Sequence, residues 1–265
     1  MHENNLHENK EKKTVRITAV SYLNTKPLLY GLLNSDVSRD ITLTLDIPSV
    51  CAQKLRDGEA DLGLIPVAAI PELTTPHIIS DYCIGAVGAV KTVCIFSDVP
   101  IYEIETLYLD YHSRTSVELA KILLEKYWHV APRFLKSDDF YLQKLGGTIA
   151  GLAIGDKTMG LDKKFRYVYD LGEAWGNYTS GLPFVFAAWV SCKPLSEIFL
   201  KKFNAALKAG LNHIPELIYL LPTQENGFDL NEYFTKYISY DFDAQKHKAL
   251  RRFLSEINSN VVLVG

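Results

Sequence analysis

Polar side chains follow an apolar run near the start of the chain, where they could bind a small anion. Residues 15–20 are predicted to form a buried strand, residues 21–27 break it, and residues 28–33 are predicted to be helical. A strand that runs directly into a helix leaves free backbone N–H groups at its carboxyl end, where open α/β sheets bind ligands and where anions are favoured. Asn24 adds an uncharged amide at this point. The alternative is that Asn24 only caps the helix.

A second break carries hydroxyl groups and a guanidinium. A predicted strand at residues 107–110 leads toward Ser113, Arg114, Thr115 and Ser116. An amphipathic helix then follows to about residue 128. The N-terminus of a helix, Ser/Thr hydroxyls and an arginine together suit a carboxylate or a phosphate. The alternative is a well-capped helix with a surface arginine.

Alternating strands and helices would position the first break at the edge of a parallel sheet. Apolar patterns predict strands at residues 15–20, 41–47 and 61–65, each followed by a helix. This order is typical of a parallel sheet. Residues 78–97 differ, because they are extended, apolar and dotted with glycine. Such strands suit either a passage between two lobes or an ordinary antiparallel hairpin.

The second half of the chain adds two further candidate stretches. Residues 149–154 are predicted to be a buried strand that leads to Asp156, a helix cap or a ligand contact. Residues 172–183 are rich in aromatic, glycine and polar residues and include Trp175 and Thr179. They are predicted to be a loop, and long loops inside compact domains tend to be functional.

The remaining elements favour two lobes in one α/β protein. Residues 184–190 are predicted to be a central strand, and the chain is mostly helical beyond residue 194. Those helices are expected at residues 195–211, 216–221, 230–240 and 244–258. No linker rich in Pro, Gly or Ser separates the lobes, so we expect crossing strands near residues 108–110 and 186–189.

Composition excludes several classes of partner. The chain has 265 residues, is 48% hydrophobic, carries a net charge of −3 and has a pI near 6.2, which leaves no electrostatic footprint for nucleic acid. No apolar run is long enough to span a membrane. Residues 1–13 are polar and are expected to be a disordered tail without a signal peptide. The four cysteines form no C-x-x-C pair and are expected to be buried free thiols in a reducing cytosol.

Motifs for common cofactors and catalytic centres are absent. The sequence has no G-x-G-x-x-G, P-loop, G-x-S-x-G or H-E-x-x-H motif, and its histidines are scattered. No Cys/His spacing supports a zinc site. What remains is a cleft lined by hydroxyls, an amide, an arginine and aromatic residues, which suits a small carboxylated molecule.

Several of these stretches together resemble the MqnA family, the chorismate dehydratases of the futalosine pathway of menaquinone biosynthesis. The match covers about residues 14–250. It is carried by SYLNTKP at residues 21–27, GEADLGLIP at 58–66, SRTS at 113–116, IGD at 154–156, DLGEAW at 170–175 and GLPFVFAAW at 181–189. Related MqnD enzymes share the fold, but their first strand–helix turn reads differently.

The resemblance implies an α/β, two-lobed fold of the type II periplasmic-binding-protein kind, with a central ligand cleft and crossing strands between the lobes. We expect residues 14–108 and 189–265 to form lobe 1 and residues 109–188 to form lobe 2. The family works in the cytoplasm and needs no cofactor or metal. Its partner is a small-molecule dicarboxylate, with no nucleic acid and no membrane.

The resemblance also assigns residues. Asn24 and Thr92 are expected to be catalytic. The family often has a Gly-Pro-Val-x-Ser-like run where this chain has Ala89 in place of proline, but Thr92 keeps the hydroxyl. The expected substrate-binding residues are Tyr22, Leu23, Ser113, Arg114, Thr115, Ser116, Asp156, Trp175 and Thr179.

The family reaction is a hydro-lyase step that removes water from chorismate and gives 3-[(1-carboxyvinyl)oxy]benzoate. Aromatisation drives it, so the protein mainly orients groups and stabilises developing charge. No Asp, Glu or His in the strongest motifs is an obvious base, which makes the substrate's own enolpyruvyl carboxylate a candidate. The alternatives are a cytosolic solute-binding or sensor protein for a small carboxylated metabolite, and an MqnD-type lyase on the same scaffold.

Overall fold

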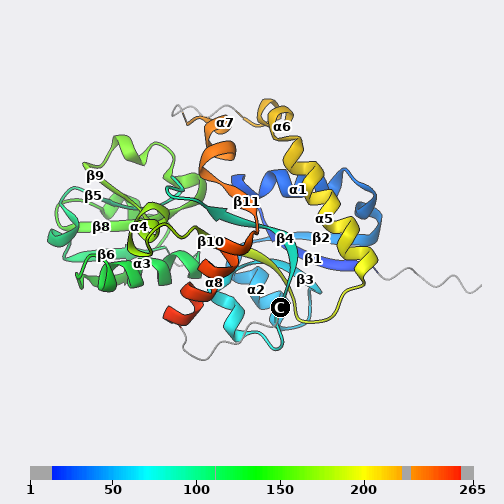
Figure 1. The fold of residues 1–265 in the computed structure, drawn as a ribbon. Helices are drawn as coiled ribbons and strands as arrows, with labels where there is room; N and C mark the ends of the chain where they lie inside the picture. The colour runs from blue at the N-terminus through cyan, green and yellow to red at the C-terminus, as the bar shows by residue number, and fades with distance from the viewer. Residues whose placement is uncertain (1–13, 111, 223–227, 258–265) are drawn as a thin grey trace, which may run out of the picture.

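Two separate β-sheets form the frame of the molecule, which the computed structural model describes over residues 14–110, 112–222 and 228–257. The tail expected at residues 1–13 lies outside these residues. Figure 1 shows the second sheet at the left of the molecule and the first sheet toward the right, with α8 (Ala244–Ile257) between them. The fold is therefore α/β with two lobes, as predicted.

The first sheet has the strand order β11-β4-β10-β3-β1-β2. Its strands are β1 (Val15–Val20), β2 (Ile41–Asp46), β3 (Leu62–Pro66), β4 (His77–Ala86), β10 (Phe184–Ser191) and β11 (Ser239–Asp241). β1 pairs in parallel with β2 and β3, and β10 is antiparallel to β3. The carboxyl ends of β1 and β3 therefore lie at the same edge of the sheet.

The second sheet has the order β7-β6-β8-β5-β9. Its strands are β5 (Val93–Ser97), β6 (Thr106–Leu109), β7 (Arg133–Lys136), β8 (Ile149–Ile154) and β9 (Tyr167–Asp170). β6 is parallel to β7 and β8, whereas β5 is antiparallel to β8 and β9. The carboxyl end of β8 consequently lies beside the first residues of β5.

Helices cover both sheets, and one contact between them depends on glycine. The helices are α1 (Lys26–Leu33), α2 (Pro48–Arg56), α3 (Arg114–Lys126), α4 (Leu171–Tyr178), α5 (Glu197–Asn212), α6 (Ile214–Leu220), α7 (Leu230–Glu232) and α8. Short 3₁₀ turns include η1 (Leu23–Thr25), η3 (Val67–Glu72) and η6 (Gly155–Thr158), and η8 (Tyr233–Tyr237) is a π-helical turn. α1 and α5 cross so closely that a Cβ on Gly31 would lie 2.0 Å from the carbonyl oxygen of Ala206.

The chain changes sheets at two places that differ from those predicted. β4 and β5 belong to different sheets, so the first passage falls at residues 87–92, and the second falls at residues 179–183, before β10. The predicted crossings near 108–110 and 186–189 instead coincide with β6 and β10, which each stay in one sheet. Apolar patterns mark strands but not their partners. We propose that lobe 1 comprises the described residues of 14–86 and 184–257, rather than 14–108 and 189–265, and that the described residues of 93–178 form lobe 2.

Two further predictions of local structure were wrong. Residues 172–183 are not a continuous loop, because α4 occupies their first part. Asp170 caps α4 by accepting hydrogen bonds from Gly172 N and Glu173 N, and its carboxylate also accepts from Val90 N and Lys91 N in the first passage between sheets. Residues 230–240, predicted as one helix, form α7, η8 and β11 instead.

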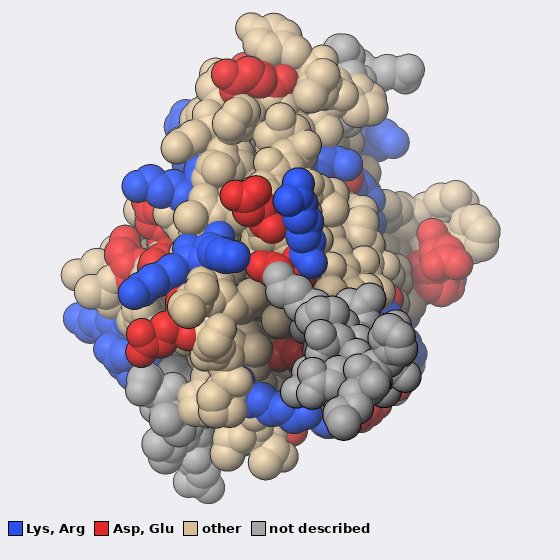
Figure 2. Space-filling model, turned by 90° about the vertical axis from the view of Figure 1, so that its right-hand side faces the viewer, with Lys and Arg blue, Asp and Glu red and all other residues tan. Residues whose placement is uncertain are grey.

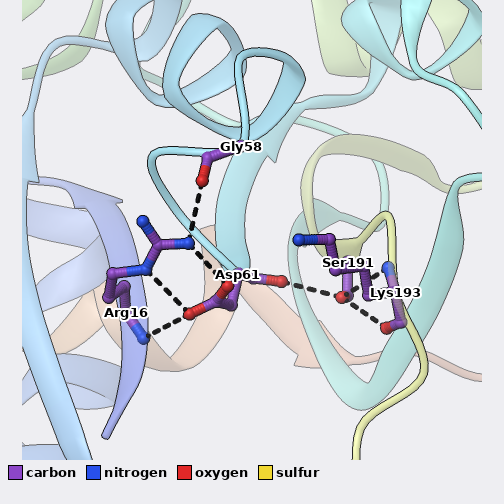
Figure 3. A network of polar contacts seen from close by, with 5 residues as sticks. All are labelled: Arg16, Gly58, Asp61, Ser191 and Lys193. Atoms are coloured by element: carbon purple, nitrogen blue, oxygen red, sulfur yellow. Dashed lines mark hydrogen bonds and ion pairs between the residues drawn. The ribbon is translucent and has the colours of Figure 1, made fainter. Parts of the chain in front are cut away.

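Polar contacts fix three neighbouring strands at the edge opposite the carboxyl ends of β1 and β3. Arg16 donates from its backbone N and its Nε to Asp61 Oδ2, both at 3.0 Å, and from Nη2 to Asp61 Oδ1 and to Gly58 O (Figure 3). The Ser191 hydroxyl lies 2.7 Å from the carbonyl oxygens of Asp61 and Lys193. This network joins β1, β3 and β10 and so holds in register the strands whose other ends carry the polar residues.

The face that Figure 2 shows carries charged side chains of both signs. Lys and Arg side chains are interspersed there with Asp and Glu, and no stripe of one sign crosses the visible described residues. Within the described ranges, no helix has the length and apolar character that crossing a membrane requires. Cys51, Cys83 and Cys94 are free and buried, as expected, and Cys192 is free and partly buried.

Candidate active site

A cleft opens where the two sheets face each other. The ends of β1, β3 and β8, the start of β5 and the N-terminus of α3 line it, and it holds about 560 Å³ of space between atoms, part of it open to solvent. Its apolar walls include Val20, Leu64, Ile84, Ile154 and Phe186. The predicted site residues that line it are Tyr22, Asn24, Thr92, Ser113 and Ser116. Asn24 thus approaches the cavity from one lobe, and Ser113 and Ser116 approach it from the other.

Tyr22 is the only lining residue with an ionisable side chain in the part of the chain that the structure describes. Burial, reinforced by the carboxylates of Asp110 and Asp156, raises the pKa of Tyr22 to about 12. The phenol is therefore neutral at pH 7, and the cleft offers neutral hydrogen-bonding groups in apolar surroundings. Such a site favours an anion through oriented dipoles rather than through a paired cation.

Asn24 lies in η1, directly after β1, with its backbone and its side chain both held. Its carbonyl oxygen accepts a hydrogen bond from the Tyr240 hydroxyl at 2.8 Å, and its Oδ1 accepts from the Thr25 hydroxyl at 3.2 Å. The N-cap residue of α1 is Thr25 and not Asn24, and the Thr25 side chain makes no capping hydrogen bond. The amide of Asn24 is therefore available to the cleft.

Thr92 lies just before β5, at the end of the first passage between the sheets. Its carbonyl oxygen accepts from Gly155 N at 2.8 Å, which joins β5 to the end of β8. Its side chain is almost fully buried, and Oγ1 lies 3.0 Å from the Tyr233 hydroxyl. The hydroxyl at position 92 is thus fixed from behind by a residue of the C-terminal segment.

Ser113 and Ser116 form the start of α3. Ser113 is the N-cap residue, and its Oγ accepts from Ser116 N at 3.3 Å and lies 3.0 Å from Ser116 Oγ. The first N–H groups of a helix and its dipole attract negative charge. This end of the cleft is therefore suited to a carboxylate.

Arg114 and Thr115 do not line the cleft. The Arg114 guanidinium makes a two-pronged ion pair with Glu72 of η3, with Nη1 2.7 Å from Oε2. The hydroxyl of Thr115 is buried and accepts from Ala68 N at 3.2 Å. Both residues tie α3 of the second lobe to η3 of the first. The sequence placed Arg114 and Thr115 in the correct turn. Their side chains point away from those of Ser113 and Ser116, because successive residues of a helix face different directions.

Leu23 and Asp156 meet each other across the two lobes. Leu23 is buried, and its backbone N–H donates to Asp156 Oδ1 at 3.3 Å. Desolvation raises the pKa of Asp156, although one side of the residue remains exposed. Asp156 lines a neighbouring hollow that shares Tyr22 and Ile154 with the cleft. It therefore lies at the margin of the cleft rather than inside it.

Trp175 and Thr179 lie away from the cleft. Trp175 is fully buried, donates from Nε1 to Pro183 O at 3.0 Å, and packs edge-on against Phe184 and Phe253. The Thr179 hydroxyl donates to Trp175 O at 2.7 Å. Both residues belong to the end of α4 and its contact with α8. An aromatic residue in a glycine-rich stretch can belong to a binding loop or to a core. Trp175 belongs to the core, because it lies on the buried side of α4.

Sequence reasoning missed Tyr233 and Tyr240, which lie behind Asn24 and Thr92. The stretch that carries them was predicted as an unbroken helix, and no motif marked it. Its density of tyrosine was the available signal. No cluster of three or more His, Cys, Asp or Glu side chains that could hold a metal ion occurs within the described ranges.

Solved structures show the class of fold to which this chain belongs. The alkanesulfonate-binding protein SsuA from Xanthomonas axonopodis pv. citri, bound to MOPS, matches with a TM-score of 0.60 and 14% identity over 90% of each chain. The aliphatic sulphonate-binding protein SsuA from Escherichia coli matches with a TM-score of 0.58 and 14% identity over 94% of this chain and 92% of that one. The fold is that of the periplasmic binding proteins.

The family follows from the sequence of this chain. It belongs to the menaquinone-biosynthesis family, whose sequence profile matches residues 15–258. Protein AF1704 from Archaeoglobus fulgidus has a similar structure, with a TM-score of 0.71 and 14% identity over 93% of this chain and 97% of that one. The family resemblance and the fold expected from the motifs are thereby confirmed.

Proposed function

We propose that this chain is a chorismate dehydratase of menaquinone biosynthesis, a cytoplasmic hydro-lyase that converts chorismate to 3-[(1-carboxyvinyl)oxy]benzoate. The family membership and the MqnA-like motifs support the pathway. The observation that carries the reaction is the character of the cleft, which combines one carboxamide, four hydroxyls and a helix N-terminus without an ionised side chain among its described lining residues. Such a cleft can hold a dianion and leave acid–base work to the substrate.

The substrate's two carboxylates would be held by hydroxyls and by backbone N–H groups. Ser113, Ser116 and the first turn of α3 form one anion-binding end, and Thr92 faces it from the start of β5. Hydrogen bonds from neutral donors to a carboxylate are charge-assisted and are stronger than neutral pairs. This arrangement would fix the ring in the apolar middle of the cleft.

Elimination then needs a base at C3 and a leaving group at C4. The C3–H bond breaks, its electron pair forms the C3–C4 double bond of the aromatic ring, and the C4–O bond breaks. The proton and the hydroxide leave together as water, so no oxidant or cofactor is consumed. Asn24 is proposed to donate from its amide to the charge that develops in the reacting region.

The proposed base is the enolpyruvyl carboxylate of the substrate. Asp156 is a carboxylate that the motifs mark, but it accepts Leu23 N–H at the margin of the cleft. A base within the same molecule has a high effective concentration when the protein holds the right conformer. The protein's contribution is therefore to orient the substrate and to exclude water.

Turnover of chorismate by the purified chain tests this proposal. The product is expected to be lighter than chorismate by one water and to show the ultraviolet absorption of a benzoate, and a protein-free incubation controls for spontaneous breakdown. Binding of chorismate without product would favour a sensor or solute-binding protein. Neither binding nor product would favour an MqnD-type lyase that acts on another substrate of the pathway.

A further inference from the structure

Tyr233 lies behind the cleft, where three distant segments of the chain converge. It opens the π-helical turn η8, and its side chain is 1% exposed. The cleft-lining residues Asn24 and Thr92 come from the end of β1 and the start of β5. Extra residues in π-helical turns often occur at functional sites.

The Tyr233 hydroxyl contacts both polar residues that were expected to be catalytic. Its oxygen lies 3.0 Å from Thr92 Oγ1, and the Asn24 side chain is near enough to the phenol to lower its pKa. Burial raises the pKa of Tyr233, while the hydrogen bonds from Thr92 and Asn24 oppose this rise. The phenol remains protonated at pH 7, so it can donate one hydrogen bond and accept others.

The remaining contacts of these residues favour a positioning role. Asn24 Oδ1 already accepts from Thr25 Oγ1, and Thr92 Oγ1 lies 3.5 Å from Val90 O, at the limit of a hydrogen bond. The phenol is therefore the strongest described side-chain partner of the Thr92 hydroxyl. Rotation of a threonine hydroxyl or an asparagine amide moves its donor by more than the tolerance of a preorganised site.

We propose that Tyr233 is a positioning residue that orients the Thr92 hydroxyl and the Asn24 amide toward the substrate. It does not line the cleft itself. This inference rests on the proposed function for its kinetic test, but not for its spectroscopic one. Tyr233 also makes activity depend on the C-terminal segment, which packs against the first sheet through β11.

The kinetic test uses Tyr233→Phe, which removes the hydroxyl and keeps the ring packed against Phe228 and Phe234. A lost positioning contact is expected to lower kcat by roughly 10- to 100-fold, with a much smaller change in KM. The matched control is Tyr169→Phe, whose hydroxyl accepts from Ile101 N at 2.7 Å outside the cleft. That variant is expected to lose some stability and to keep kcat.

A double-mutant cycle separates positioning from general weakening of the fold. If Tyr233 acts in part through Thr92, the loss of kcat in Tyr233→Phe combined with Thr92→Val will be smaller than the product of the two single losses. Thr92→Ser keeps the hydroxyl and is expected to retain most of the wild-type kcat. Losses that multiply in the double variant, or an unchanged kcat in Tyr233→Phe, would overturn the inference.

The side-chain amide signals of Asn24 in a ¹⁵N-labelled protein give a readout that does not need chorismate. They are identified by their disappearance in Asn24→Asp. They are expected to shift in Tyr233→Phe and to stay in place in Tyr169→Phe. A wild-type protein that leaves chorismate unchanged would refute the proposed function alone, whereas unshifted Asn24 signals in Tyr233→Phe would refute the role of Tyr233.

Discussion

Asp156 accepts a hydrogen bond from the backbone N–H of Leu23 at 3.3 Å, and this contact joins the turn after β8 in one lobe to the turn after β1 in the other. Both turns bound the cleft, so the contact fixes the distance between its two walls. Thr115 and Arg114 add further links between the lobes through Ala68 and Glu72. The geometry of the site thus depends on contacts that surround it as well as on the residues that line it.

The first prediction concerns the effect of pH on Asp156. Desolvation raises the pKa of Asp156 above its unfolded value of 3.8. At a pH between the unfolded and the folded pKa, the native state therefore binds more protons than the unfolded state. The free energy of unfolding therefore falls as the pH rises through the folded pKa. Asp156→Asn cannot ionise but can still accept the N–H of Leu23. Urea unfolding of both proteins from about pH 4 to pH 7 should show the variant gaining stability relative to wild type as pH rises. A constant difference would contradict this view of Asp156.

The second prediction concerns Asn24. Removal of one preorganised donor from a water-poor site typically lowers kcat by about 10²-fold, and we expect this loss in Asn24→Ala. The free energy of unfolding should change by no more than about 1 kcal/mol, because the amide is partly exposed and the hydrogen bond that it accepts from Thr25 is weak. Asn34→Ala, which removes an exposed amide that donates to Tyr30 O, is the control. Near-normal turnover in Asn24→Ala would remove this residue from the mechanism.

The third prediction separates Arg114 from the substrate. Its guanidinium is paired with Glu72, so Arg114→Gln should cost at most about 1 kcal/mol of stability. The KM for chorismate should stay within roughly threefold, since a lost charged hydrogen bond to a carboxylate would cost about tenfold or more. Glu72→Gln breaks the same pair from its other side and should behave alike. A large rise in KM confined to Arg114→Gln would show that the arginine reaches the substrate.

The positions of the two strand–turn–helix breaks were predicted correctly from the sequence. The directions of the side chains in those turns were predicted only in part. The turns at Asn24 and at Ser113 do meet at one cleft, because the turn after β1 and the N-terminus of α3, which follows β6, line the same cavity. Arg114 and Thr115 are adjacent to Ser113, yet they point toward η3. Residue spacing defines which turn a residue occupies, but the packing of α3 against the other lobe decides which of its side chains face the cavity.

The strand partners and the C-terminal contribution could not be predicted in the same way. Trp175 follows a cap at Asp170 that the glycine-rich composition obscured, so a core residue was assigned to a loop. Tyr233 lies 141 residues from Thr92 along the chain. A contact of this range leaves no periodic signal in a single sequence.

The fourth prediction concerns the network at the far edge of the first sheet. The hydrogen bonds from Arg16 hold the pKa of Asp61 below its usual range. The ionised carboxylate therefore stabilises the fold at a pH above the pKa of Asp61 in the unfolded chain, and this stabilisation is lost as the pH falls through the pKa of Asp61 in the folded protein. Asp61→Asn should therefore lower the free energy of unfolding more at pH 7 than at about pH 3. Asp36→Asn on the exposed surface is the control. An equal cost at both pH values would show that the ion pair with Arg16 contributes little.

Incubation of the purified chain with chorismate, followed by mass and ultraviolet spectra, tests the central claim most directly. The account predicts a product lighter by one water with benzoate absorption, formed by wild type and at least tenfold more slowly by Asn24→Ala. Chorismate that remains unchanged in the presence of folded wild-type protein would contradict it.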